Sequence, residues 1–145
     1  MAYLTVADIE RELSLDFSAT TEPTDTEISE FITQVEAELN GVLASVGVTV
    51  PVSSTSSPYS YAMIRQAATF GVCARVLGAY TGIATEEAPR EAAYWQRYRD
   101  FLNQIREDPA ILFDASFGSS DVRVDGITDS DDEYHEAYFE MDMEF

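Results

Sequence analysis

The chain has 145 residues, 46% of them hydrophobic, with 27 acidic side chains against 8 basic ones and a formal net charge of −19 at pH 7. This length is sufficient for one domain with a modest core. The charge repels the phosphates of DNA and the surface of an anionic membrane, which argues against sequence-reading DNA binding and against membrane adhesion.

The first predicted element is a short helix within residues 3–15, YLTVADIERELSL. Thr5 and Asp8 have the spacing of a capping box, and one narrow apolar stripe follows at Val6, Ile9 and Leu13. The N-terminus has no basic segment followed by an apolar core, so we expect no signal peptide. Residues 16–25 are rich in turn formers and predict a loop.

The clearest helix is predicted from Thr24 to Gly47. Thr24 and Glu27 form a second capping box, and Gly47 is a typical C-terminal stop. Apolar side chains follow the helical period at Ile28, Phe31, Ile32, Val35, Leu39, Val42, Leu43 and Val46. We expect the opposite side of the helix to carry Glu30, Glu36 and Glu38.

A helix of a different kind is predicted over 59–82, after a loop that ends at Pro58. Apolar side chains occupy more than one of its faces, so we expect it to be surrounded by other elements. No acid occurs from residue 39 to residue 85. This stretch is therefore expected to form the centre of the fold and to face other subunits, with the interface residues Arg65, Phe70, Ala74, Arg75 and Leu77.

The only cysteine, Cys73, lies within this helix, so an intrachain disulfide is not possible. In a helical apolar pattern it is expected to be a buried, inert thiol. No apolar run in the chain reaches the length that spans a membrane.

The last long helix is predicted over 85–107, capped by Thr85 and ended by Asp108-Pro109. Its expected buried stripe consists of Ala92, Trp95, Tyr98, Phe101, Leu102 and Ile105. Half of the basic residues of the chain lie here, at Arg90, Arg97, Arg99 and Arg106. They could form a row that binds phosphate, but we favour ion pairs with acids of the same or an adjacent subunit.

After Pro109 the pattern changes to alternation, and Asp125-Gly126 is a hairpin turn signal. We therefore divide the chain into a helical body over 1–110 and an acidic-aromatic arm over 111–145. The predicted fold class is mainly α: a small bundle of one short and three long helices, with an extended C-terminal arm that forms a strand or a short helix.

The last segment of the arm, residues 129–145, combines eight acids with large apolar side chains and one His, and has no Arg or Lys. As a strand, one face would carry Phe139, Met141, Met143 and Phe145; as a helix, one stripe would carry Tyr134, Tyr138, Met141 and Phe145. Either form leaves an apolar stripe that favours docking on a partner. The expected partner-binding residues are Val122, Val124, Tyr138, Phe139, Met141, Met143 and Phe145. A solvated acidic tail, or packing on its own body, is the alternative.

Signals for catalysis and metal binding are weak, so we expect no enzyme, no cofactor, and no catalytic or metal site. The only histidine, His135, lies in the arm, and the chain has no Gly-rich phosphate loop and no His/Cys cluster. Acids from Asp129 to Glu140 have some of the spacing of a calcium loop. However, Tyr134 occupies the position where the tight turn requires Gly.

Four segments in order resemble a known family: YLTVADIERELSL; ISEFITQVEAELNGVL leading to VTVPV; IRQAATFGVCARVLGAY; and YWQRYRDFLNQI. In element order and residue texture, residues 3–107 resemble the small helical head–tail connector proteins, or adaptors, of tailed viruses. The resemblance implies a structural virion protein of the neck, assembled in the host cytoplasm. It does not extend past Pro109.

The resemblance further implies a ring of about twelve copies. One side of the ring would bind the portal protein, and the other would receive the next neck or tail-completion protein. The genome would pass through the centre on ejection without sequence-specific binding, because acids that line the channel keep phosphates away. The alternative from another class is an acidic DNA-mimic or inhibitor protein, whose acids would occupy a nucleic-acid cleft.

All the basic residues are Arg, and the chain contains no Lys. This bias is typical of proteins in molar salt, where charges are screened over about 3 Å, or of a GC-rich genome. We favour the first, and with it a halophilic archaeal virus, because GC content alone does not explain the acid excess.

Overall fold

The two capping boxes begin the first two helices as the sequence predicts. In the computed structural model, which describes residues 3–79 and 84–118, α1 (Val6–Leu13) begins after Thr5 and α2 (Asp25–Ser45) begins after Thr24. In each box the threonine side chain accepts a hydrogen bond from the backbone N–H three residues on, and the acid at that position accepts one from the threonine N–H. Local sequence therefore fixes both starts.

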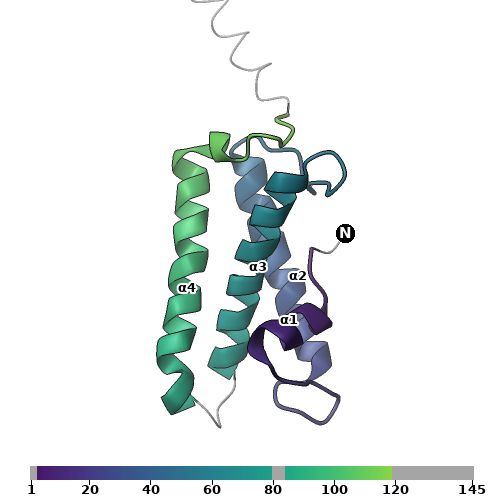
Figure 1. The fold of residues 1–145 in the computed structure, drawn as a ribbon, viewed down its shortest axis with the longest axis vertical. Coiled ribbons are helices and arrows are strands. Elements are labelled where there is room, and N and C mark those ends of the chain that lie inside the picture. The colour runs from purple at the N-terminus through teal and green to yellow at the C-terminus, as the bar shows by residue number, and fades with distance from the viewer. Residues whose placement is uncertain (1–2, 80–83, 119–145) are drawn as a thin grey trace, which may run out of the picture.

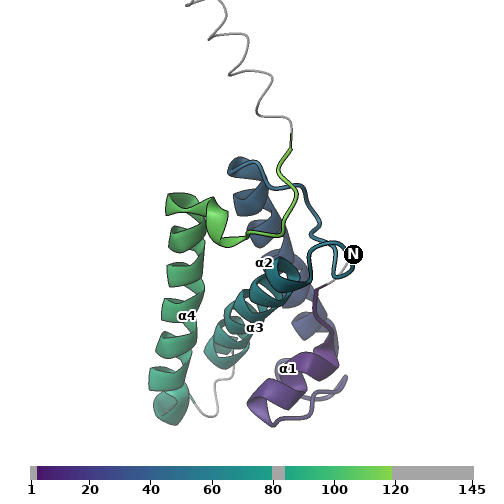
Figure 2. The same cartoon turned by 45° about the horizontal axis from the view of Figure 1, so that its top comes forward.

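The remaining elements are α3 (Pro58–Ala79), α4 (Ala84–Glu107) and a short 3₁₀ helix, η2 (Pro109–Ile111). The described part is mainly helical and contains no strand, which confirms the predicted fold class. Figure 1 shows α2, α3 and α4 running up, down and up, with α3 between the other two. The short α1 packs near one end of the bundle, against α2 and α3 (Figure 2).

The central position of α3 confirms that this helix is surrounded. It contacts all three other helices, and its fully buried side chains include Ile64, Ala68, Val72 and Val76. Gly71 has a particular packing role, because a Cβ atom there would meet the Tyr98 ring at 2.9 Å and Val35 at 3.0 Å. The small residue thus lets α4 and α2 approach α3 closely.

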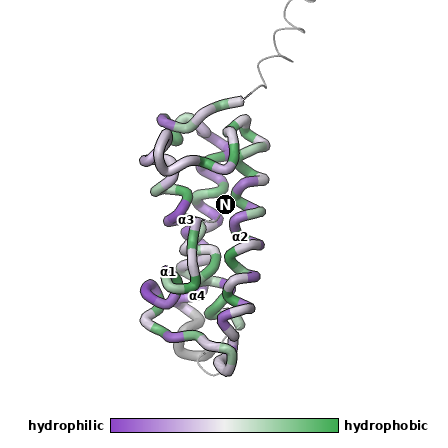
Figure 3. The backbone as a smooth tube through the Cα atoms, turned by 90° about the vertical axis from the view of Figure 1, so that its right-hand side faces the viewer, coloured by the Kyte–Doolittle hydropathy of each residue, from purple (hydrophilic) through white to green (hydrophobic). Residues whose placement is uncertain are grey.

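The buried stripe of α2 follows the prediction, and hydrophobic and hydrophilic residues alternate along this helix (Figure 3). Glu36 is the exception, since it is buried with 8% exposure instead of facing solvent. On α4, Tyr98, Leu102 and Ile105 are buried as predicted. However, Ala92 is exposed and Tyr94 is buried in its place, because the helix turns Tyr94 toward α3.

Residues 111–118, the first part of the predicted arm, pack on the body. Leu112 is fully buried. Phe117 forms an isolated antiparallel bridge with Val48, where the N–H of Thr49 donates to the carbonyl of Ser116 at 2.7 Å. The N–H of Gly118 donates to the carbonyl of Gly47 at 2.6 Å. These contacts hold the end of the described chain beside the loop that follows α2.

None of the helices among the described residues combines the length and the hydrophobicity needed to cross a membrane.

Candidate interaction site

The residues predicted to face other subunits separate into two groups. Ala74 and Leu77 are 0% and 1% exposed, because the chain's own helices enclose them. This corrects the prediction for these two positions: the acid-free sequence here reflects the internal core, and neither side chain reaches the surface. Arg65 is exposed, Phe70 and Arg75 are partly exposed, and their role in an interface stays a prediction.

One face of α3, between α1 and α4, carries accessible side chains, and we call this face the α3 trough. A groove of about 480 Å³ between α1 and α3 is lined by Asp8, Arg11, Glu12, Ala62, Met63, Arg65, Gln66 and Thr69. A second groove of about 240 Å³ between α3 and α4 is lined by Met63, Gln66, Ala67, Phe70, Phe101, Gln104 and Ile111. Met63 and Gln66 line both grooves, so the two grooves lie next to each other on this face of α3. Figure 1 views α3 with α4 on one side of it and α1 on the other.

Arginines lie over aromatic rings along the contact of α3 with α4. The guanidinium of Arg97 lies 5.5 Å from the centre of the Phe70 ring, and that of Arg90 lies 5.7 Å from the Tyr94 ring. The Phe70 and Tyr94 rings are 6.0 Å apart. At these separations each guanidinium is attracted by the negative face of its ring. Arg97 is thereby held at the α4 wall of the α3 trough.

On the other flank of α4, Arg75 connects all three long helices. Its guanidinium lies 5.5 Å from the centre of the Trp95 ring and donates to Glu38 at 3.2 Å. The hydroxyl of Tyr98 donates to the same carboxylate at 2.9 Å. Burial raises the pKa of Tyr98, and the hydrogen bond to Glu38 raises it further. Tyr98 therefore remains a hydrogen-bond donor at any physiological pH.

The ion pairs differ from those predicted for α4. Within the described residues, Arg97, Arg99 and Arg106 form no ion pair with an acid. The described pairs belong instead to α1, α2 and α3, where Asp8 pairs with Arg65 and Arg11, and Glu38 pairs with Arg75. No described acid of the same chain therefore pairs with these three arginines, and pairing with acids outside the described residues stays a prediction. Their pairing with an adjacent subunit stays a prediction.

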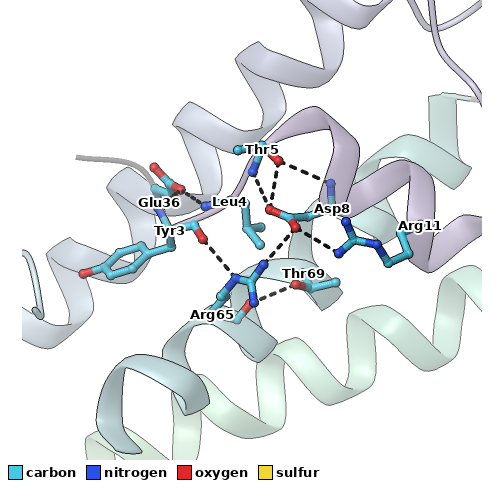
Figure 4. Close-up of polar contacts among 8 residues, drawn as sticks. All are labelled: Tyr3, Leu4, Thr5, Asp8, Arg11, Glu36, Arg65 and Thr69. Carbon is cyan, nitrogen blue, oxygen red and sulfur yellow. Dashed lines mark hydrogen bonds and ion pairs between the residues drawn. The ribbon is translucent and has the colours of Figure 1, made fainter. Parts of the chain in front are cut away.

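A polar cluster at the N-terminus connects the first residues to α2 and α3 (Figure 4). One oxygen of Glu36 accepts hydrogen bonds from the backbone N–H groups of Tyr3 and Leu4. Arg65 donates to the carbonyl of Tyr3 at 3.3 Å and to Asp8 at 2.8 Å. Partial burial opposes ionisation of Asp8, but hydrogen bonds from Thr5 and the charge of Arg65 outweigh it, so its pKa is lowered. This cluster fixes α1 on the body.

A second cluster binds the end of the described chain to the start of α3. Asp114 accepts hydrogen bonds from the N–H groups of Tyr59 at 2.8 Å and Ser60 at 2.9 Å, and also from the Ser60 hydroxyl. It thus acts as a cap that lies 54 residues from Ser60 in sequence. Desolvation opposes ionisation of this carboxyl, but these hydrogen bonds outweigh it, and the pKa of Asp114 is lowered.

Three large apolar side chains are exposed at the same end of the bundle. Tyr59 and Phe113 are 65% and 70% exposed and lie with ring centres 5.5 Å apart, while Phe117 is 48% exposed. They surround the point where the chain continues past Gly118. An exposed aromatic group of this kind is typical of a surface that contacts another segment or protein.

The expected partner-binding residues of the arm, Val122, Val124, Tyr138, Phe139, Met141, Met143 and Phe145, lie outside the described residues. So do His135 and the acids with calcium-loop spacing. In the part of the chain that the structure covers, no group of three His, Cys, Asp or Glu side chains is placed to hold a metal ion.

Sequence reasoning missed Glu36, Tyr94 and Asp114. Glu36 lies four residues after Ile32 and three before Leu39, both buried, so its helical phase was a usable signal. Asp114 had no such signal, because its role depends on a contact far away in sequence. No protein-family model, no curated protein and no solved structure matches this chain.

Proposed function

We propose that the chain is a structural virion protein, a head–tail adaptor that forms a ring between the portal and the next neck or tail protein. The ring contains about twelve copies. It leaves a central passage for DNA and acts without an enzymatic step. The resemblance of residues 3–107 to the adaptor family motivates the proposal, and the order of one short and three long helices is in keeping with it.

The observation that carries the proposal is the charge difference between the two helices that flank α3. α2 has five acids and no base, whereas α4 has five acids together with four of the eight arginines. Arg99 and Arg106 are exposed and have no acid partner within the described residues. Packing the arginine flank of one copy on the acidic flank of the next repeats the same contact around a closed ring.

The acid excess is also compatible with a DNA passage. A channel that must let a duplex slide should not bind its phosphates, and carboxylates on its wall repel them. The protein then acts as a conduit, with its affinity directed at the portal and at other copies of itself.

The test is assembly of the full chain. The mass of the purified protein, alone and with the portal protein from the same genome, is measured by mass photometry. We expect a particle of about twelve times the chain mass of 16.1 kDa, carried on the portal. Replacing Arg99→Glu should reduce assembly at least tenfold, while Arg11→Glu, a matched charge reversal on α1, should not. A monomer that does not bind the portal protein and instead competes with DNA for an enzyme would support the DNA-mimic alternative.

A further inference from the structure

The floor of the α3 trough has no acidic side chain, although the chain as a whole is very acidic. The helix beneath it contributes Arg65 and no acid, because residues 39–85 contain none. The walls add Arg11 and Arg97 as well as Asp8 and Glu12. Arg65 and Arg11 both pair with Asp8, so Arg97 is the arginine of this face that no described acid pairs with, in a chain whose net charge is −19.

The floor of the trough also has an apolar pattern. Tyr59, Met63, Gln66 and Phe70 lie at positions i, i+4, i+7 and i+11 of α3, which places them in one row. Tyr59 is 65% exposed, and Met63 and Phe70 are partly exposed. Such a row extends over about 16 Å at 1.5 Å per residue and accepts one amphipathic helix of similar length.

Residues 129–145 have the matching properties. They contain eight acids and no Arg or Lys, so their charge is opposite to that of Arg97. As a helix, they would place Tyr134, Tyr138, Met141 and Phe145 in one row, at the same relative positions i, i+4, i+7 and i+11 as the α3 row. The segment therefore complements the trough in charge, in apolar pattern and in length.

The chain between the two is long enough to join them. Residues 119–128 follow Gly118 and reach at most about 33–36 Å when extended. α3 has 22 residues, and at 1.5 Å per residue it is about 33 Å long. A tether of about ten residues gives the attached segment an effective concentration on the order of millimolar, which favours the chain's own trough over that of another molecule.

We propose that residues 129–145 fold back as an amphipathic helix and dock in the α3 trough of the same chain before assembly. The acids of the segment face Arg97 and Arg65, and its apolar row covers Met63 and Phe70. The unassembled chain thereby hides its accessible apolar face. This inference concerns the isolated chain and does not depend on ring formation.

The test places a nitroxide label in the trough of the full chain through Gln66→Cys. The native Cys73 is fully buried and does not compete for the label. We expect the amide signals of residues 134–145 to lose most of their intensity. A matched label at Gln34→Cys, on the exposed side of α2, should leave them unchanged. Equal effects from the two labels, or no effect from either, would overturn the proposal.

Two further arms identify the occupant and the source of affinity. Chains that carry the nitroxide but no ¹⁵N are mixed with ¹⁵N chains that carry no nitroxide, and the ¹⁵N signals should be unaffected. Broadening of these signals would mean that a second copy supplies the segment, and the proposal would fail. Arg97→Gln should lower the ratio of docked to free segment by about two- to fivefold. Arg99 lies about 200° further around α4 than Arg97, so Arg99→Gln should not change this ratio. An equal change of the ratio in both variants would mean that the charge of Arg97 does not hold the segment in the trough.

Discussion

Gly71 of α3 lies against the ring of Tyr98 in α4, so closely that a Cβ atom on Gly71 would meet two ring carbons at 2.9 Å. Tyr98 is 1% exposed and has no free space to move into. Adding a methyl group to a packed contact of this kind typically costs about 1–3 kcal/mol. The close approach of α4 to α3 thus requires glycine at position 71.

The first prediction follows from this contact. Gly71→Ala should lower the free energy of unfolding in urea, because the overpacking outweighs the gain in helix propensity of about 0.5–1 kcal/mol. Gly41→Ala, on the exposed side of α2 with nothing within 4 Å of its Cβ, should instead raise it by about 0.5–1 kcal/mol. Changes of the same sign in both variants would contradict this account of the packing.

Glu36 gives the second prediction. Its carboxylate is the acceptor for the buried N–H groups of Tyr3 and Leu4. Glu36→Ala leaves both donors without a partner and should reduce the free energy of unfolding by about 2–4 kcal/mol. Hydrogen exchange at these two amides should accelerate at the same time. Glu30→Ala, a matched change at an exposed position of α2, should stay within about 0.5 kcal/mol of the original protein.

Asp114 gives a prediction that depends on pH. Its pKa is lower in the folded chain than in the unfolded one, so its contribution to stability is present above the unfolded value of about 3.9. That contribution is lost as the pH falls through the lower folded value. Asp114→Asn should therefore be less stable than the original protein at pH 6, and the difference should shrink below about pH 4. Asp16→Asn, at an exposed position, is the control, and a gap that is constant with pH would count against the cap.

Cys73 gives the fourth prediction. Burial raises the pKa of its thiol to about 12, and the nearby negative charge of Glu12 adds to this effect. At pH 8 it should react with a disulfide reagent about a thousandfold more slowly than an exposed thiol, because so little thiolate is present. Full reaction should require denaturant. The introduced thiol of Gln34→Cys, on the exposed side of α2, serves as the exposed reference, and comparable rates at the two positions would mean that the α3 core opens readily.

The sequence predicted the elements whose signals are local. Thr5 with Asp8, and Thr24 with Glu27, are capping boxes that need no tertiary information, and both form. The central place of α3 was visible from apolar side chains on several faces. The error for Ala74 and Leu77 arose because a fully buried helix and an interface helix leave the same pattern, and only the packing of α2 and α4 distinguishes them.

Features that depend on distant contacts could not be predicted. Asp114 is one acid among 27 in the sequence, and only the fold brings it to the start of α3. The alternation from Phe113 to Phe117 predicted strand character, but Leu112 and Asp114 tie this stretch to the body, and a single bridge remains. In the same way, Tyr94 is buried because it packs on Phe70 of α3, with ring centres 6.0 Å apart.

The bridge between Val48 and Phe117 has a mechanical consequence. Tension applied to the chain at Gly118 acts first on the hydrogen bonds to Gly47 and Thr49, and then on Asp114 at the start of α3. The load is shared by two segments near the C-terminus of α2 and the N-terminus of α3 before it can reach α4. A protein built in this way resists unravelling when it is pulled from its C-terminal end.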